Sequence, residues 1–287
     1  TRPFEVSEQD LEKQLNEHLF TPCASTEQSH FGWVNALGKH GNTAVHSVGG
    51  NFLICARKEE KILPAPVIKE QLEEKVSKLE ADQGRSATKK EKEQFKEDII
   101  FELLPRAFSR VTDTHAYINA AHNLIVINSS SRGKAEDVLA LLRKALGTLP
   151  VTSMSPEKAP DELMTDWLTD TDLGENFQLG MEAEFNALGD DGAVVRVKNQ
   201  DLGSDEIKAH LDAEKFVVKL ALEWDDAMSF MLCDDLSIKR VKFFDVLHEQ
   251  NDDIDKDDVV ARLDADFALM AGELNRFIDD LLNEFDI

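Results

Sequence analysis

The sequence lacks long apolar runs and has few cysteines. No stretch approaches the roughly 20 apolar residues that a bilayer-spanning helix needs. The first residues, TRPFEVSEQDLEK, lack the apolar core of a secretory signal peptide. The three cysteines are widely spaced and odd in number, which is typical of a reducing compartment rather than of a disulfide framework. We therefore expect a cytoplasmic protein with no membrane partner.

Basic residues are fewer than acidic residues, 32 against 56, and they are unevenly distributed. Residues 1–150 carry 20 Lys and Arg against 21 Asp and Glu, whereas residues 151–287 carry 12 against 35. The resulting net charge of −24 argues against a broad attraction to nucleic acid. Eleven basic residues nevertheless lie between Arg57 and Lys96, so a local basic surface is compatible with the acidic total.

Motifs that bind nucleotides or metal ions are missing as well. The sequence has no Walker loop, no GxGxxG and no His/Cys cluster at zinc spacing. Asp253, Asp255 and Asp257 follow the spacing of an EF-hand loop, but Asp258 stands where that loop requires Gly. An acidic helix start explains these residues better. We expect no cofactor, no metal site and no catalytic residue.

Hydrophobic periodicity predicts an α+β fold in the first half. Two hairpins are expected, at residues 44–58 with a turn at Gly49–Gly50, and at residues 115–130. Helices are expected after Ser7 and across residues 138–146. Between the hairpins, residues 67–104 predict two helices that join near Gly84 and stop at Pro105. These two helices would form a projecting helical arm.

The second half predicts a second, acidic α+β domain. Residues 151–176 are polar and indicate a linker, and a helix is expected at each of residues 204–215 and 267–285. Alternating apolar residues predict antiparallel strands at 192–200, 216–224, 227–233 and 237–244. The expected division is an N-terminal domain of residues 1–65 and 111–150, an inserted arm of residues 66–110 and a C-terminal domain of residues 151–287.

Two groups of basic residues are candidates for contact with phosphate. In the predicted arm, Lys89, Lys92 and Lys96 share one helix face, and Lys75, Lys78 and Arg85 belong to the helix before it. In the acidic half, Arg196 and Lys198 share one strand face, and Arg240 and Lys242 share another. Such faces can neutralise phosphates without reading a sequence. Pattern alone favours the alternative for both groups, a solvated surface with Asp and Glu as ion-pair partners.

Two further features allow both a functional and a structural interpretation. Phe108 lies between Arg106 and Arg110, where an exposed ring would anchor a partner or stack on a base and a buried ring would pack. The Asp pairs at 225–226 and 234–235 offer carboxylates like those that hold Mg²⁺ in nucleases. Their places between predicted strands are, however, typical of turns.

Several segments together resemble the bacterial recombination-associated RdgC family. They are TPCAS at 21–25, ICARKEEKILPAPVIK at 54–69, ELLPRAFSR at 102–110, KAEDVLALLRKALGTLPV at 134–151, RVKNQDL at 196–202, MLCDDLSIKRVKF at 231–243 and DIDKDDVVARLDADFALMAGEL at 253–274. The likeness covers essentially the whole chain in order. It implies a ring-shaped homodimer of curved, multi-subdomain protomers with a positively charged hole. The implied function is nucleoid-associated, sequence-independent binding of double- and single-stranded DNA that restrains RecA-driven recombination, without catalysis.

The resemblance also directs attention to particular residues. Those expected to contact phosphate are Lys75, Lys78, Arg85, Lys89, Lys90, Lys92, Lys198, Gln200 and Arg240. Asn199 stands where the family carries Lys, so it is not among them. Phe108, with Arg106, is expected at a dimer contact that helps to close the ring. Two alternatives remain, which are a metal-dependent nuclease that uses the acidic turns and an acidic DNA mimic that binds a basic protein.

Overall fold

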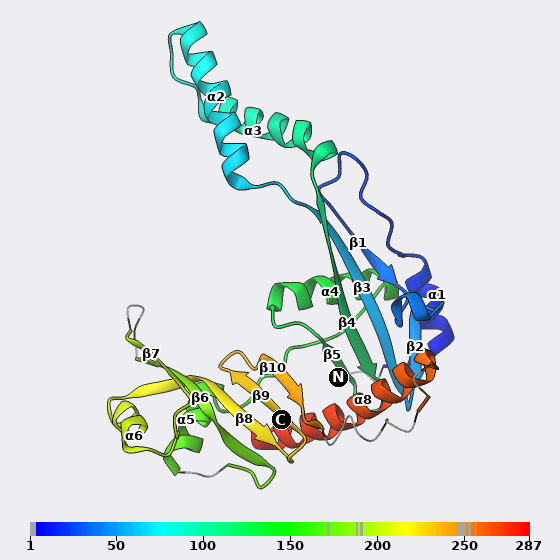
Figure 1. Ribbon diagram of the computed structural model, residues 1–287, viewed down its shortest axis with the longest axis vertical. Coiled ribbons are helices and arrows are strands. Elements are labelled where there is room, and N and C mark those ends of the chain that lie inside the picture. The colour runs from blue at the N-terminus through cyan, green and yellow to red at the C-terminus, as the bar shows by residue number, and fades with distance from the viewer. Residues whose placement is uncertain are drawn as a thin grey trace. The chain divides into compact units, whose positions relative to one another are not determined.

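The computed structural model describes residues 4–170, 173–187, 189, 192–245, 251, 254–255 and 257–287 (Figure 1). They form two compact units, one of residues 4–128 and 134–149 and the other of residues 129–133 and 150–287. Each unit contains one antiparallel sheet with helices, which confirms the predicted α+β class. Within the described ranges, no helix is long and apolar enough to cross a bilayer. The three-part division into domains stays a prediction.

The sheet of the first unit has five strands. Its order is β1-β3-β4-β5, with β2 paired to β3. The strands are β1 (Ser29–Val34), β2 (Val45–Val48), β3 (Asn51–Lys61), β4 (Ser109–Asn119) and β5 (Leu124–Ile127). Both predicted hairpins are confirmed, and the β2–β3 turn places Gly49 and Gly50 at φ 57° and 81°, where residues with a side chain are strained. β1 was not predicted.

Two helices supply much of the apolar core of this unit. α1 (Glu8–Asn16) begins at Ser7, whose hydroxyl accepts a hydrogen bond from the Asp10 amide, as the sequence predicted. It buries Leu11 and Leu15 completely, and α4 (Arg132–Leu146) buries Leu142. Each such side chain contributes about 1.5–3 kcal/mol when it leaves water. A short 3₁₀ turn, η1 (Gly38–His40), precedes β2.

The arm enters and leaves the sheet at one point. It consists of α2 (Ala65–Gln83), α3 (Lys89–Leu103) and the 3₁₀ turn η2 (Leu104–Arg106). Lys61, the last residue of β3, pairs with Ser109, the first residue of β4. The arm is therefore an insertion between neighbouring strands, and the two predicted helices with their stop at Pro105 are confirmed (Figure 1).

The sheet of the second unit also has five strands. Its order is β10-β9-β8-β6-β7. The strands are β6 (Phe177–Ala187), β7 (Val194–Lys198), β8 (Lys215–Trp224), β9 (Met228–Cys233) and β10 (Ile238–Phe243). The helices among the described residues are α5 (Pro160–Asp170), α6 (Asp205–Asp212) and α8 (Val259–Glu284). The predicted meander β8–β9–β10 is confirmed, whereas β6 was not predicted.

The predicted linker at residues 151–176 is wrong for residues 160–170, which form α5. α5 buries Met164, Trp167 and Leu168, which recur at helical spacing. The Thr165 hydroxyl accepts a hydrogen bond from the Val217 amide of β8 at 2.9 Å. The many polar residues of this stretch concealed its apolar stripe, and packing against β8 stabilises the helix.

Aromatic rings fill the core of the second unit. Phe277 of α8 lies 4.8 Å from the ring of Phe230 and 5.7 Å from that of Trp224, in edge-to-face contacts. The Trp224 indole donates a hydrogen bond to Asp280 at 2.8 Å, so its buried N–H is satisfied. The predicted C-terminal helix is confirmed. Cys23, Cys55 and Cys233 are free thiols in the structure.

Candidate nucleic-acid interface

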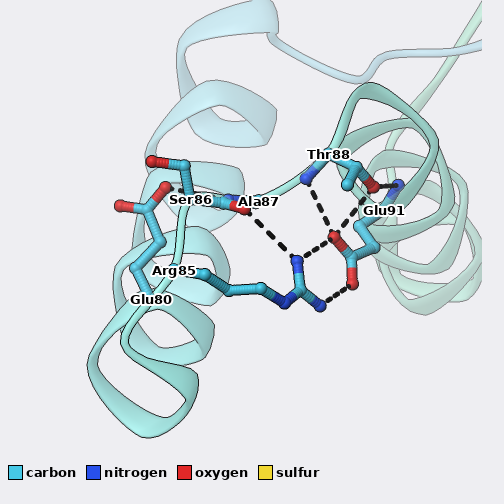
Figure 2. Close-up of polar contacts among 6 residues, drawn as sticks. All are labelled: Glu80, Arg85, Ser86, Ala87, Thr88 and Glu91. Carbon is cyan, nitrogen blue, oxygen red and sulfur yellow. Dashed lines mark hydrogen bonds and ion pairs between the residues drawn. The ribbon is translucent and has the colours of Figure 1, made fainter.

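Residues 84–92, here called the arm tip, connect α2 to α3 through a loop that is fixed by hydrogen bonds. Gly84 ends α2 at φ 63°, a left-handed conformation that favours glycine. Figure 2 shows that Arg85 then turns toward Glu91 and donates to both of its carboxylate oxygens, at 2.9 and 2.6 Å. Glu91 also accepts from the amide and the hydroxyl of Thr88, each at 2.8 Å. The capping box predicted at Thr88 is thereby confirmed.

The carboxylates of Glu80 and Glu91 both bind groups of this loop. Glu80 accepts a hydrogen bond from the Ala87 amide at 3.0 Å (Figure 2). The Arg85 guanidinium, followed by the hydrogen bonds of Thr88, holds the pKa of Glu91 well below its ordinary value. The negative charge of Glu91 is therefore matched by Arg85, and hydrogen bonds from the loop reach both α2 and α3.

Lysines dominate the exposed surface of the tip. Lys89, Lys90 and Lys92 are all exposed in the first turn of α3, and the Lys89 side chain is 93% exposed. The Lys89 ammonium lies 4.0 Å from Glu93, while Lys90 and Lys92 have no ion pair with any described residue. With Arg85 the tip carries four basic residues against one acidic residue. The start of α3 adds the positive end of a helix dipole, so the tip favours anions.

Two predicted arm residues have partners inside the arm. Arg85 pairs with Glu91 as described, and Lys75 of α2 lies 3.2 Å from Glu102 of α3. Both follow the ion-paired alternative, although their part in binding stays a prediction. Lys78 is exposed and lines a shallow groove of about 260 Å³, together with Lys75, Leu79, Asp82, Gln83 and Phe95.

A second group of cations lies on one face of the second unit's sheet. This face, here called the polar face, carries six cations and three carboxylates: Arg196, Lys198, Lys219, Lys239, Arg240 and Lys242 with Glu182, Glu184 and Glu223. The strands with the predicted cations do join one sheet, but β7 and β10 form its opposite edges. The face has a surplus of positive charge within the acidic half of the chain.

Carboxylates of β6 hold three of these cations. Arg196 Nε donates to Glu184 at 2.7 Å, and Lys219 Nζ lies 3.0 Å from both oxygens of the same carboxylate. Arg240 donates to Glu182 at 2.9 Å from an irregular part of β10. The hydrogen bond from Arg196 is the main reason that the pKa of Glu184 lies below its ordinary value. The predicted cross-strand ion pairing is thus present.

Two predicted residues near the polar face, Lys198 and Gln200, have no ion pair with a described residue, and one cation of the face was not predicted from the sequence. Lys198 lies opposite Glu182 and is exposed, and Gln200 donates to the Ser204 hydroxyl at 3.2 Å. Lys219 was not predicted as a site residue. Its place between the buried Val218 and Leu220 on an alternating strand was the available signal, because such a residue points to the opposite face.

Phe108 is exposed, so the buried packing interpretation is wrong, and its role as an anchor for a partner stays a prediction. Phe108 lies at the base of the arm and is 84% exposed, and the neighbouring Ile62 is 49% exposed. The Ile62 amide donates a hydrogen bond to the Phe108 carbonyl at 2.7 Å. Arg110 pairs with Glu60 at 3.2 Å on the neighbouring strands, and Arg106 is exposed. An apolar surface flanked by charged groups is typical of a protein contact.

The acidic turns have the geometry expected of turns. Asp225 and Asp226 have φ of 47° and 48°, and Asp225 pairs with Arg276 at 2.7 Å. Asp235 accepts hydrogen bonds from Ser237, and burial raises the pKa of Asp234. No group of three or more His, Cys, Asp or Glu side chains in the described part of the chain is placed to hold a metal ion.

The EF-hand-like aspartates precede α8. Asp253 lies outside the described residues. Asp255 accepts a hydrogen bond from the Asp257 amide, and Asp258 caps α8 by accepting from the Ala261 amide, each at 3.0 Å. The predicted acidic helix start is confirmed.

Known proteins match this chain over its full length. A family model described as "Putative exonuclease, RdgC" matches residues 1–287. A recombination-associated protein RdgC of Colwellia psychrerythraea is 77% identical over 287 residues, which cover 100% of this chain and 94% of that protein. Proteins of the same name from Aeromonas hydrophila and Salmonella paratyphi B are 54% and 48% identical, over 98% of this chain and 93% of each relative.

Proposed function

Because the chain belongs to the RdgC family, we propose that it binds double- and single-stranded DNA without sequence preference, as a ring-shaped homodimer that restrains RecA-driven recombination. The relatives' name connects them with recombination. One observation carries the DNA-binding part. The arm tip neutralises its own carboxylate and presents Lys89, Lys90 and Lys92 to solvent.

The chemistry of the tip fits the phosphate backbone rather than the bases. Ammonium groups on flexible stems bind phosphate as point charges and release counterions from DNA. Lys89, Lys90 and Lys92 occupy the first turn of α3, where the positive end of the helix dipole adds to the attraction for anions. Such contacts position DNA but do not distinguish one sequence from another.

The exposed base of the arm supports the homodimer. Phe108 and Ile62 offer an apolar contact that a symmetric partner would cover. A ring with two-fold symmetry needs two separate contacts on each protomer, and this surface is our candidate for one of them. Restraint of RecA then follows from occupancy, because DNA held by this protein is not free for RecA. On this account the protein is cytoplasmic and associated with the nucleoid.

The first test compares two variants with the same change in net charge. Lys89, Lys90 and Lys92 are replaced by Glu in one variant, and the exposed Lys13, Lys39 and Lys144 are replaced by Glu in the control. Polarisation of labelled duplex and single-stranded DNA gives the affinity between about 50 and 200 mM salt. We expect the tip variant to lose at least tenfold in affinity for all sequences alike and to show a shallower salt dependence.

Three results would contradict the proposal. The control variant could lose as much affinity as the tip variant, the loss could depend on the DNA sequence, or the wild-type affinity could be independent of salt. DNA degradation with Mg²⁺ that vanishes on Asp234→Ala would instead support the nuclease that the family description names. Binding to a basic protein without binding to DNA would support an acidic mimic.

A further inference from the structure

On the polar face, cations surround the Glu184 carboxylate in the way that they would surround a bound anion. Its side chain is only 15% exposed and lies between two cations from the strands on either side of β6. Arg196 approaches from β7 at 2.7 Å and Lys219 from β8 at 3.0 Å. Two cationic donors therefore converge on one pair of carboxylate oxygens.

A phosphate group makes the same demands as this carboxylate. Arginine binds carboxylate and phosphate with similar geometry, and lysine adds a point charge to either. Glu182 repeats the arrangement with Arg240 at 2.9 Å, and Lys198 is its direct cross-strand neighbour. The two glutamates occupy the positions at which the cations of this face would otherwise hold an external anion.

We propose that Glu184, together with Glu182, competes internally with DNA phosphates for the cations of the polar face and so limits the affinity for DNA. The inference rests on the proposed DNA binding and concerns its regulation. In the free protein, the glutamates hold Arg196, Lys219 and Arg240 in place and cancel part of their charge. When DNA binds, phosphate oxygens replace the carboxylate oxygens on these donors.

The proposal predicts a gain of affinity. Glu184→Gln removes the negative charge but keeps the length of the side chain, so Arg196 and Lys219 become available to phosphate. We expect tighter binding of a labelled duplex. The slope of log affinity against log salt should steepen by about 0.9 for each added phosphate contact.

The control is Glu223→Gln. Glu223 lies on the same face of β8, and no described cation lies within ion-pair distance of its carboxylate. This variant makes the same change in net charge, so it reports the general electrostatic effect. Only the excess of Glu184→Gln over this control measures the release of the two cations.

A double-mutant cycle supplies a readout that a purely structural role would not move. Arg196→Gln should weaken DNA binding more in the Glu184→Gln background than in the wild type, because Arg196 is free of its carboxylate only in that background. Glu182→Gln, which releases Arg240, provides a second and independent variant if Glu184→Gln fails to fold. Circular dichroism establishes folding for each protein.

The outcomes separate this inference from the proposed function. If the wild type does not bind DNA, the proposed function fails. If the wild type binds but both glutamate variants match Glu223→Gln, or bind more weakly, only the internal competition is overturned. Tighter binding with a steeper salt slope and a non-additive Arg196→Gln effect supports it.

Discussion

At the scale of single residues, carboxylates decide which cations remain available. Glu91 forms an ion pair with Arg85, and Glu102 forms one with Lys75. Glu184 forms ion pairs with both Arg196 and Lys219. Ion pairs at the surface contribute only about 0–1 kcal/mol to stability, so the Arg85–Glu91 and Lys75–Glu102 pairs matter more for the surface charge than for the fold. On the proposed function, the cations left without such partners are the ones available to DNA phosphates.

The ion pairs of Glu184 predict how stability depends on pH. Its pKa lies below the ordinary value of 4.5 because Arg196, and after it Lys219, favour the charged form. A depressed pKa means that this stabilisation is present above about pH 4.5 and is lost as the pH falls below it. Urea unfolding should show Glu184→Gln less stable than the wild type at neutral pH, with the difference narrowing in acid. A difference that is constant with pH would contradict this.

At the scale of elements, the sequence predicted most of the regular structure. Strong signals were decisive where local chemistry sets the conformation, as in the Gly49–Gly50 turn and the capping box at Thr88. β1, β6 and α5 were missed for a common reason. β1 contains Gly32, β6 is rich in Ala and Glu, and α5 is polar, so each is stabilised by its neighbours rather than by its own propensity.

The candidate site was predictable only in part. Spacing identified the lysines of α3 and the strand cations, because one helix turn or one strand period fixes which residues share a face. Which carboxylate meets which cation was not predictable. Those pairs depend on the register between β6, β7 and β8, and on a loop that returns Arg85 to Glu91.

The way in which the arm is inserted allows its removal to be tested. Since Lys61 and Ser109 are paired neighbours, residues 62–108 can be replaced by a two-residue hairpin turn without interrupting the ladder between β3 and β4. We expect the shortened protein to remain folded by circular dichroism, because only Ile99 and Leu104 of the helical part are buried. Its affinity for DNA should fall in the polarisation measurement. Unchanged affinity would show that the arm does not contribute to DNA binding.

At the scale of the whole molecule, the net charge says little about binding. Charges in solution are screened within about 8–10 Å at physiological salt, so a phosphate near the tip responds mainly to the nearest lysines. The net charge of −24 instead opposes aggregation, because the protein molecules repel one another. A net negative protein with local cationic surfaces can therefore combine solubility with DNA binding.

The proposed homodimer predicts a change of mass on a single substitution. Phe108→Asp places a charge in the exposed apolar surface at the base of the arm, so we expect weaker self-association. Analytical ultracentrifugation over a range of concentrations measures it. Leu19→Asp, also at an exposed apolar residue, is the control. Equal dissociation constants for the two variants and the wild type would exclude Phe108 from the contact.

The insertion of the arm between two paired strands has a consequence for the folding pathway. β3 and β4 lie side by side but are separated in sequence by residues 62–108, and closing so long a loop is entropically unfavourable. The contacts within the helical hairpin are local, and local contacts form early. A hairpin that forms first brings Lys61 and Ser109 together. Substitutions that destabilise α2 or α3 should then slow refolding of the first unit's sheet, even though those helices lie outside it.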